Sequence, residues 1–545
     1  MAVALVAAAA PSLPVAAPAQ GTTSSRGSVL FRIGSEADER WRLDQLLRGA
    51  STEGYLLRSA ASRTDTLPGE GAELRWAFVL PELIAVHNSA LPYSVNDGSL
   101  WAGRGWSASV VGGVRGQLRG LRVMVAPTLS WASNRDFELP TDVRAAPPIP
   151  PPRSPYAYPW RVHRNSIDYP LRFGPDAVAQ VDAGQSALYM HHDRVEYGLS
   201  SENQWWGPGI RNALLLSNNA PGFGHAFVRT ARPLRTPVGA VEARYLLGGL
   251  TESAYFADSP TYRHRSFSAL AFTVQPGVAP GLTLGGARAV IAPLVKRGEI
   301  PRHLFDVLSS TGRPNARPLS DPSQTPGRDQ LLSLFARYVL PGYGFESYVE
   351  WGRAEMPASV RDALVAPSHS QGYSMGLQWA RADVVKGAAL RLQLEHTAVS
   401  QGSSFAVTPS GSWYTSRAVL QGFTQRGQVL GAAVGPGGSG QWFGGDLIAH
   451  AWTGGVFAGR IRWDDDSYFE IPRPNGSGYC KHDVSLLVGT RGSYRTGAGS
   501  AGLSLTLANR LNTFYQNFGE CPNNADRVDT RNATLGVTLS PASAR

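Results

Sequence analysis

The stretch ALRLQLEH, residues 389–396, alternates strictly between apolar and polar side chains. Successive side chains of a β-strand point to opposite faces. In an extended chain the leucines therefore occupy one face, and Arg391, Gln393 and Glu395 occupy the other. The stretch predicts a strand with one apolar and one polar surface.

The same period of two recurs along the chain, for example in GFESYVEW (344–351), YSMGLQW (373–379) and NATLGVTL (532–539). It predicts eighteen strands. We expect them near 75–87, 105–116, 121–134, 182–190, 194–201, 224–232, 238–253, 265–275, 281–292, 328–340, 343–355, 370–381, 387–399, 441–451, 455–464, 482–493, 499–511 and 528–539.

The connections between these strands alternate in length. Tight ones, such as 117–120 and 341–342, alternate with long ones such as 135–181, 293–327 and 400–440. Outer-membrane barrels have this rhythm, with the short turns in the periplasm. In lipid every backbone N–H and C=O must be paired, so a sheet of this size has to close.

The fold class predicted is therefore all-β: a large antiparallel transmembrane β-barrel of about 18 strands. A barrel of this width is too wide for side chains to fill, so its polar face lines a wet lumen. The alternative interpretation is a soluble multi-sheet protein of the periplasm, which does not require a consistent loop rhythm.

The composition agrees with many short strands and turns: 60 glycines, 39 prolines, 17% charged and 10% aromatic residues among 545. The net charge is +10, and nearly all basic residues are arginine. Arginine pairs with carboxylates and phosphates, which makes acidic saccharides or outer-membrane lipid headgroups plausible partners. A GC-rich genome that favours arginine codons is the alternative. The basic residues form no stripe, so no nucleic-acid partner is predicted.

The N-terminus resembles a secretory signal. An apolar stretch is followed by Ala17-Pro18-Ala19, a small-residue cleavage pattern, so residues 1–19 are predicted to be a signal peptide. A disordered Ala/Pro leader is the alternative.

A short N-terminal periplasmic helical segment is predicted next, within residues 20–70. Ser35 suits an N-cap, acidic residues follow it, and Gly49 suits a stop. A second short helix is expected over 52–61. An uninvolved pro-segment is the alternative. The expected division of the chain is 1–19 signal peptide, 20–70 helical segment and linker, 71–540 barrel with long extracellular loops, and 541–545 tail.

Cys480 and Cys521 fall in neighbouring long loops on the predicted extracellular side. Oxidation is permitted there, so we predict a disulfide between them. Two unpaired thiols are the alternative.

The segment ENQWWGPGIRNALLLSNNAPG, residues 202–222, is too rich in breakers to be a helix or a strand. Irregular backbone is costly against lipid but tolerated inside a wet barrel. We therefore expect it to fold inward and constrict the lumen. Indole faces also stack on sugars, so it is equally a candidate polysaccharide contact. The candidates for either role are Glu202, Trp205, Trp206, Arg211, Asn218 and Asn219. Purely structural packing of both indoles remains open.

Two further stretches contain residue types that can bind metals. HHD at 191–193 lies in a tight turn and is not predicted to hold a metal. The acidic run in WDDDSYFEIP, 463–472, is expected to be solvated, with divalent cation binding as the alternative. GxSxG, HExxH, P-loop and Rossmann signatures are absent from the sequence. We predict no catalytic residues, no metal and no cofactor, and hence no enzyme.

Three stretches in order, IDYPLRFG (167–174), GLSSENQWWGPG (198–209) and SNNAPGFGHAFV (217–228), resemble the signature region of the capsule-assembly Wzi family. The resemblance implies an outer-membrane barrel of eighteen strands with a periplasmic helical bundle. It also implies a lectin that helps attach or organise polysaccharide at the cell surface. The motif positions that match are Glu202, Trp205, Trp206, Gly207, Pro208, Gly209, Asn218, Asn219, Ala220 and Pro221.

The sequence thus predicts a non-enzymatic protein of the bacterial outer membrane that binds capsular or exopolysaccharide at the cell surface. A polysaccharide export channel is a further expected partner. The alternatives are a porin-like diffusion channel and an outer-membrane hydrolase.

Overall fold

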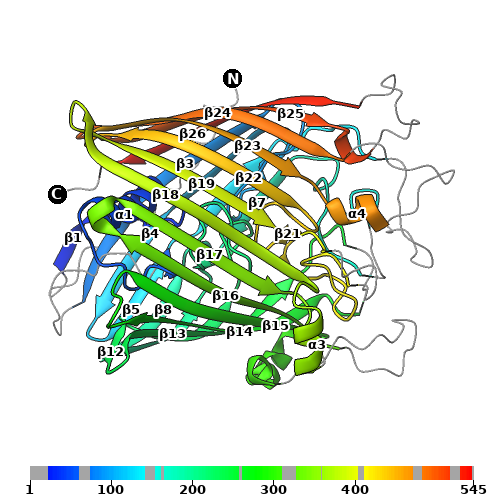
Figure 1. Cartoon of the computed structure of the whole chain (residues 1–545), viewed down its shortest axis with the longest axis horizontal. Helices are drawn as coiled ribbons and strands as arrows, with labels where there is room; N and C mark the ends of the chain where they lie inside the picture. Colours follow the sequence, from blue (N-terminus) through cyan, green and yellow to red (C-terminus); the bar gives the residue numbers. More distant parts are fainter. Residues whose placement is uncertain are drawn as a thin grey trace, which may run out of the picture.

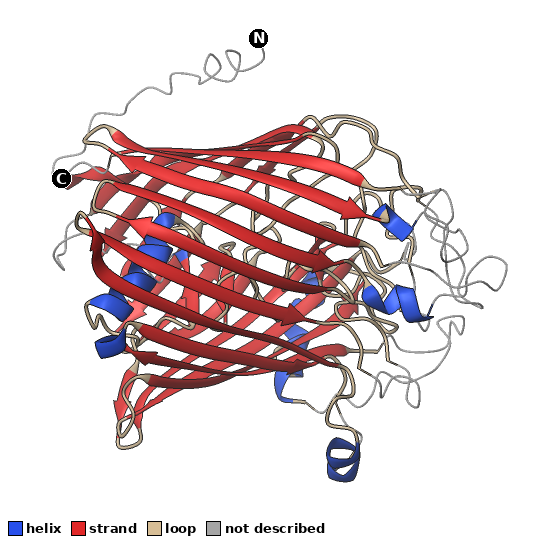
Figure 2. Ribbon diagram, turned by 45° about the horizontal axis from the view of Figure 1, so that its top comes forward, coloured by secondary structure: helices blue, strands red, loops and turns tan. Residues whose placement is uncertain are grey.

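The computed structural model describes residues 23–60, 74–140, 154–160, 165–256, 261–309, 327–356, 359–402, 410–470, 482–515 and 528–542. One closed sheet dominates it, and we call this ring of strands the wall (Figures 1 and 2).

The wall is an antiparallel barrel of eighteen strands, in which β5–β6, β7–β8 and β11–β12 are interrupted single strands. The wall strands are β3 (Arg75–Asn88), β4 (Gly105–Leu118), β5 (Leu121–Val125), β6 (Thr128–Ala132), β7 (Val178–Asp182), β8 (Ala187–His192), β9 (Val195–Ser200), β11 (His225–Thr230), β12 (Leu234–Thr236), β13 (Gly239–Thr251), β14 (His264–Pro276), β15 (Leu282–Leu294), β16 (Asp329–Leu340), β17 (Phe345–Arg353), β18 (Gln371–Val385), β19 (Ala388–Ala398), β22 (Ser439–Ile448), β23 (Trp452–Arg462), β24 (Val484–Arg495), β25 (Gly499–Leu511) and β26 (Thr530–Pro541).

The ring closes where β26 pairs with the second half of β3, up to Leu539 opposite Leu83. The first half of β3 pairs instead with β1 (Thr23–Val29), which runs parallel to it. Closure leaves the wall without a free edge, and this is how a sheet of this size avoids unpaired backbone in lipid. The predicted fold class is confirmed.

The two faces of the wall follow the alternation in the sequence. In β19, Arg391 and Glu395 are buried, whereas Leu394 is 46% exposed. The other wall strands repeat this pattern with exposed apolar side chains such as Leu188, Leu199, Val228, Phe272, Leu334, Val349, Leu377, Phe443, Val456, Val488 and Leu503. A belt of this size marks a lipid-facing surface.

The short turns gather at one end of the barrel, at the left of Figure 1, and the long loops gather at the other. The short-turn end is the periplasmic one in outer-membrane barrels. Two boundaries differ from the sequence prediction. Pro127 splits the strand expected over 121–134, because proline has no N–H for the ladder. The turn expected at 452–454 lies at 449–451 instead.

The helix α1 (Glu36–Leu47) lies inside the periplasmic mouth of the barrel (Figure 2). The Ser35 side chain caps it by accepting from the N–H of Asp38 at 3.5 Å, as the sequence predicts. Leu43 and Leu46 pack against apolar side chains of β16, β18 and β22. The helix is therefore held by the wall.

The second helix expected over 52–61 is wrong for most of that range. Residues Leu57–Ser59 form a strand, β2, that pairs with β10 (Gln204–Trp206) inside the barrel. This tertiary pairing overrides local helix propensity. The resemblance implies a helical bundle ahead of the barrel. Within the described residues 23–60, the structure gives bounds for one helix, α1.

The remaining elements lie in or near the long loops, apart from the periplasmic turn η3. They are η1 (Arg297–His303), η2 (Asp306–Leu308), η3 (Pro341–Tyr343), α3 (Val360–Val365), β20 (Thr424–Gln425), β21 (Gln428–Val429), α4 (Asp465–Glu470) and η6 (Thr513–Tyr515). Among the described residues, no helix has the length and hydropathy needed to cross a membrane. The signal peptide 1–19 and the cysteines Cys480 and Cys521 fall outside the described residues, so the cleavage and the disulfide stay predictions.

Candidate functional site

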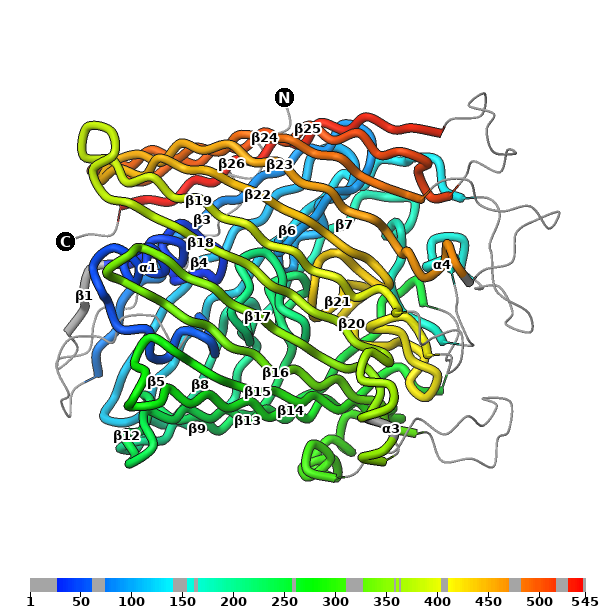
Figure 3. The backbone as a smooth tube through the Cα atoms, viewed as in Figure 1, coloured from blue at the N-terminus to red at the C-terminus, as the bar shows by residue number. Residues whose placement is uncertain are grey.

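Residues 201–224, which we call the inner segment, cross the lumen between β9 and β11 (Figure 3). Nearly all of its residues are buried. On the far side it reaches wall carboxylates: Glu395 accepts from the N–H groups of Ile210 and Arg211 at 2.6 and 3.0 Å. Glu350 accepts from the N–H of Leu214 at 3.2 Å. Polar wall groups thus satisfy the irregular backbone of the segment.

Two glycines show why this segment is rich in breakers. A Cβ on Gly209 would lie 1.7 Å from the carbonyl oxygen of Asn212. Gly207 has φ +122°, in the region that L side chains rarely adopt. The tight return of the chain inside the barrel therefore requires glycine at both positions.

The paired tryptophans are interior side chains. Trp206 is 0% exposed and belongs to the main core cluster, and its backbone N–H donates to the carbonyl of Leu216. Trp205 is 2% exposed, packs against Ile33, and carries the guanidinium of Arg58 over its ring. Neither indole offers an open face for a sugar to stack on.

The other predicted site residues join the inner segment to its surroundings. Glu202 pairs with Arg229 of β11 at 3.5 Å. Arg211 lies over the ring of Trp442. Asn218 donates to the carbonyl of Asn96 in loop 89–104. Asn219 donates to the carbonyl of Val429 in the loop 399–438. The motif residues buried in the same segment are Gly207, Pro208, Gly209, Ala220 and Pro221.

Residues 410–438 of the loop after β19 lie over the inner segment on its extracellular side. Ser217 donates to the carbonyl of Gly431 at 2.6 Å, and Tyr414 donates to the carbonyl of Leu214 at 2.9 Å. Residues of this loop also reach the wall, where Arg265 of β14 donates to the carbonyl of Gly422. Two layers of chain therefore fill the lumen above α1.

Buried ion pairs anchor α1 to the wall. Glu346 of β17 pairs with Arg42 of α1 and with Arg337 of β16, and all three side chains are buried. A buried carboxylate between two guanidinium groups is stable only while all three remain in place.

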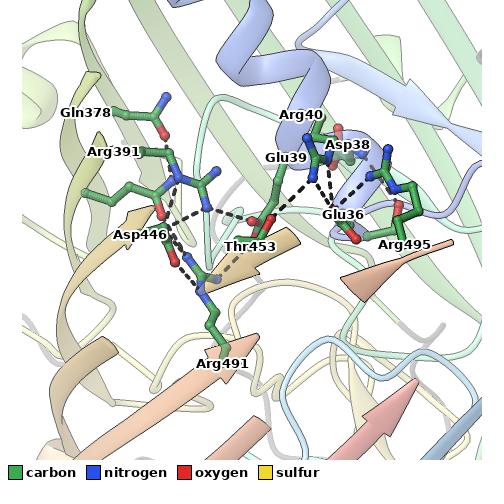
Figure 4. Close-up of polar contacts among 12 residues, drawn as sticks. Glu36, Asp38, Glu39, Arg40, Gln378, Arg391, Asp446, Thr453, Arg491 and Arg495 are labelled. Atoms are coloured by element: carbon green, nitrogen blue, oxygen red, sulfur yellow. Dashed lines mark hydrogen bonds and ion pairs between the residues drawn. The ribbon is translucent and has the colours of Figure 1, made fainter. Parts of the chain in front are cut away.

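A second network of ion pairs also anchors α1 to the wall (Figure 4). Glu39 of α1 pairs with Arg391 at 2.7 Å and Arg491 at 3.1 Å, and both arginines also bind Asp446. Burial alone would raise the pKa of Glu39, but Arg491 and Arg391 outweigh it and hold the pKa at about 2. Arg391 and Arg491 are thus committed to internal carboxylates rather than free for an acidic ligand.

The long-loop end contains a cavity of about 110 Å³, which we call the aromatic recess. Its lining is drawn from separate loops and consists of Pro92, Tyr93, Ser94, Trp101, Phe137, Tyr158, Trp160, Tyr169, Pro170, Leu171, Ala433, Val434, Gly435, Pro436, Trp463, Asp464, Asp483, Arg510, Phe514 and Tyr515. At about 30 Å³ per water the space would hold about four waters, which is room for part of a sugar ring.

The backbone of the recess is strained where two rings enter it. Phe514 has φ +56° and Tyr515 has φ +55°, a left-handed conformation that is unusual for bulky residues. Phe514 is held by a hydrogen bond from its N–H to Asp483 at 3.0 Å, and the Tyr515 hydroxyl donates to the carbonyl of Trp463. Strain of this kind is often found at binding sites.

Polar groups at fixed positions accompany the rings. Arg510 binds Asp483 through two hydrogen bonds of 2.7 and 2.6 Å. Tyr158 donates to Asp464, and burial together with that carboxylate raises the pKa of Tyr158 well above its usual value. The recess therefore combines ring faces with two carboxylates and one guanidinium, which suits the hydroxyl groups of a neutral sugar.

No sequence motif predicted the aromatic recess. Its side chains are separated by up to several hundred residues, and their shared feature is an aromatic residue in a long loop. The sequence features that could have indicated it are the aromatic stretches AYPW (157–160) and NTFY (512–515). Only the barrel brings them together.

A second cavity opens on the periplasmic side, with a volume of about 1580 Å³ between α1 and the strands β23–β26 and β3. Asp97 lines it, whereas Ser94 lines the aromatic recess. The Ser94 hydroxyl donates to Asp97 at 2.8 Å, so one hydrogen-bonded turn lies between the two cavities.

The residues considered for metal binding have other partners. His191 lies 3.0 Å from Glu196, and in the acidic run Asp465 pairs with Arg462 and His482. Within the described ranges, no group of three or more metal-ligating side chains is found.

A closed antiparallel barrel with an apolar exterior, a filled lumen and long loops at one end defines an outer-membrane β-barrel protein. The chain belongs to the capsule-assembly Wzi family: the model of "Capsule assembly protein Wzi" matches residues 174–444, which include the inner segment. The resemblance stated from the sequence and the outer-membrane location are confirmed.

Among solved structures the chain is similar to Wzi of Escherichia coli, described as an outer-membrane protein involved in group 1 capsule assembly and as a carbohydrate-binding β-barrel. The TM-score is 0.55 at 13% identity, covering 95% of this chain and 100% of that one. OccAB4 of Acinetobacter baumannii follows with a TM-score of 0.39 at 8% identity, covering 87% and 99%. OprD of Pseudomonas aeruginosa has a TM-score of 0.37 at 9% identity, covering 86% and 94%. No curated protein sequence matches the chain.

Proposed function

We propose that this protein is a lectin of the outer membrane that binds capsular or exopolysaccharide at the cell surface and helps attach or organise it. Membership of the capsule-assembly family supports this, as does the carbohydrate binding described for the E. coli protein. The observation that carries the proposal here is the aromatic recess at the long-loop end.

Within this proposal the two aromatic regions have different tasks. The aromatic recess takes one neutral sugar unit of the polymer: the rings of Trp160 and Phe514 contact its C–H surface, and Asp464 accepts from a hydroxyl. The inner segment is the lumen plug, since the rings of Trp205 and Trp206 are buried. Its role as a direct sugar contact remains the alternative.

The finer parts of the proposal concern processing and partners. Residues 1–19 are removed as a signal peptide, 20–70 form the periplasmic segment, 71–540 the barrel and 541–545 a tail. A polysaccharide export channel delivers the polymer, and outer-membrane lipid surrounds the wall. The protein performs no catalysis, so assays for glycan or lipid ester hydrolysis should show no turnover.

Retention of the organism's own surface polysaccharide on the purified, detergent-solubilised protein tests the proposal. The native protein should retain it, and Phe514→Ala together with Tyr158→Phe should weaken retention about tenfold or more. Phe469→Ala is the matched control, because this aromatic side chain at the same end is 66% exposed and does not line the aromatic recess. Unchanged retention by the recess variant would show that the sugar binds elsewhere.

Conductance measurements in planar bilayers distinguish the proposed lectin from a diffusion channel. The filled lumen predicts no steady current through the native protein. A large steady current would contradict the plug and favour a channel.

A further inference from the structure

A second binding surface lies on the outside of the barrel. The segment 295–309, which contains η1 and η2, packs on the outer face of β13, β14 and β15 (Figure 1, green, near α3). Strand alternation fixes the side. Arg244 of β13 faces the lumen, where it binds Gln204, so its neighbour Tyr245 faces outward and donates to the carbonyl of Leu304.

This outer segment covers polar side chains that would otherwise face lipid. Arg288 of β15 points outward and donates to the carbonyls of Val307 and Ser309 at 2.7 and 2.9 Å. Its Nε donates to Gln330 of β16, also on the outer face. A guanidinium on the lipid-facing side of a barrel is unfavourable unless its hydrogen bonds are satisfied. The segment therefore completes the outer wall at this place.

The other side of the segment is exposed and amphipathic. Phe305 and Leu308 are 69% and 67% exposed, and Val295 and Leu304 are exposed as well. Beside them stand exposed basic side chains at Lys296, Arg297 and Arg302.

The acids of the segment compensate only part of this positive charge. Glu299 accepts from the backbone N–H groups of Val295 and Lys296 and lies 3.8 Å from Arg302. Asp306 is buried and pairs with His303 and Arg328.

The depth of the segment identifies what it faces. It extends from the long-loop end of the wall, where Arg297 donates to Thr251 and Ile300 lies over Gly249, down to the middle of β13 and β15. The lipid-facing belt, for example Phe272 and Leu284, begins further down the same strands. Apolar side chains beside basic ones at this level match the boundary between acyl chains and headgroups of the outer leaflet.

We propose that the segment 295–309 is a lipid-binding element that recognises the anionic phosphate headgroups of the outer-leaflet glycolipid. Lys296, Arg297 and Arg302 bind phosphate, and Phe305 and Leu308 enter the acyl region. The site is independent of the polysaccharide site, because it lies on the outer face of the wall rather than at its mouth.

Native mass spectrometry of the full-length barrel, incubated with phosphorylated or dephosphorylated lipid A, tests the proposal. The native protein should retain the phosphorylated form. A variant carrying Lys296→Gln, Arg297→Gln and Arg302→Gln should retain it on the order of a hundredfold more weakly, since each basic side chain near an anionic surface contributes roughly a factor of five. The charge-matched control, Arg194→Gln, Arg232→Gln and Lys386→Gln in periplasmic turns, should behave as the native protein.

Equal retention by the triple variant, or equal retention of dephosphorylated lipid, would overturn the proposal. Loss of a protein dimer instead of lipid would assign the surface to a second copy and overturn it as well. If the triple variant fails to migrate as a folded barrel, Arg302→Gln alone suffices. That side chain is 80% exposed, and its loss should weaken retention about fivefold.

Discussion

The inner segment and the aromatic recess both concentrate aromatic side chains, but they differ in how those rings are held. In the inner segment the indoles of Trp205 and Trp206 are enclosed, and wall carboxylates bind the surrounding backbone. In the recess Phe514 and Tyr515 are also buried, at 6% and 1% exposed, but they sit on strained backbone and line a volume of about 110 Å³. We therefore assign packing to the region with the recognisable motif and, under the proposed function, ligand binding to the region without one.

The difference also changes how the basic composition is interpreted. From the sequence, an excess of arginine makes an acidic saccharide plausible. In the structure, Arg42, Arg337, Arg391 and Arg491 bind carboxylates inside the lumen. In the recess, Arg510 is bound to Asp483. Arginine therefore stabilises the plug, and the sugar we expect is neutral.

The largest expected effect comes from breaking the anchor of the plug. Glu346→Ala leaves Arg42 and Arg337 buried without their carboxylate, which should cost roughly 3–5 kcal/mol of unfolding free energy. Denaturant unfolding in detergent measures it. Glu53→Ala, which removes the partner of the exposed Arg235, should cost less than about 1 kcal/mol. Equal costs for the two variants would show that the buried triad is not an anchor.

The next prediction distinguishes a packing role from a sugar-binding role for the aromatic side chains of the inner segment. Trp206→Ala creates a cavity in the main core cluster and should lower the unfolding free energy by about 3–4 kcal/mol. Polysaccharide retention per folded molecule should not change, because the ring is 0% exposed. A variant that stays stable but no longer retains polysaccharide would assign the sugar contact to the inner segment.

A pH effect follows from Glu39. Its pKa is about 2 in the folded protein and near 4.5 when unfolded, because Arg491 and Arg391 outweigh burial. The stabilisation it gives is fully present above pH 4.5 and is lost as the pH falls toward 2. Unfolding midpoints measured across this window should fall with pH. The fall should be smaller in Glu39→Gln, and an identical pH dependence would contradict the assignment.

The smallest expected effects concern the hydrogen bonds by which the inner segment holds loop 89–104 and the loop after β19. Asn219→Ala removes the hydrogen bond to Val429, and Asn218→Ala removes the one to Asn96. Each should cost about 1 kcal/mol. Hydrogen exchange should then rise near 428–431 in the first variant and near 94–100 in the second. A rise in the same region for both would mean that the loops open together.

The fold could be predicted almost completely from the sequence because strand alternation and loop lengths are local properties. The faces of β17, β18 and β19 follow directly from their residues. The N-cap at Ser35 is also local. By contrast, β2 could not be predicted, because its pairing with β10 depends on a partner about 150 residues away.

The site could be predicted only in part, because it also depends on contacts between residues far apart in the sequence. The inner segment stands out because its breakers are adjacent in the chain. The aromatic recess depends on loops that only barrel closure brings together. Several of its residues, such as Trp101 and Tyr158, are isolated in the sequence and so form no motif with a fixed spacing.

Hydroxyl-radical footprinting of the detergent-solubilised protein, with and without an oligosaccharide of the surface polymer, tests the division between plug and binding site most directly. We predict that the oligosaccharide protects peptides containing Tyr158, Trp160, Phe514 and Tyr515 and leaves 202–222 unchanged. Protection of 202–222 without protection of the recess peptides would contradict the account.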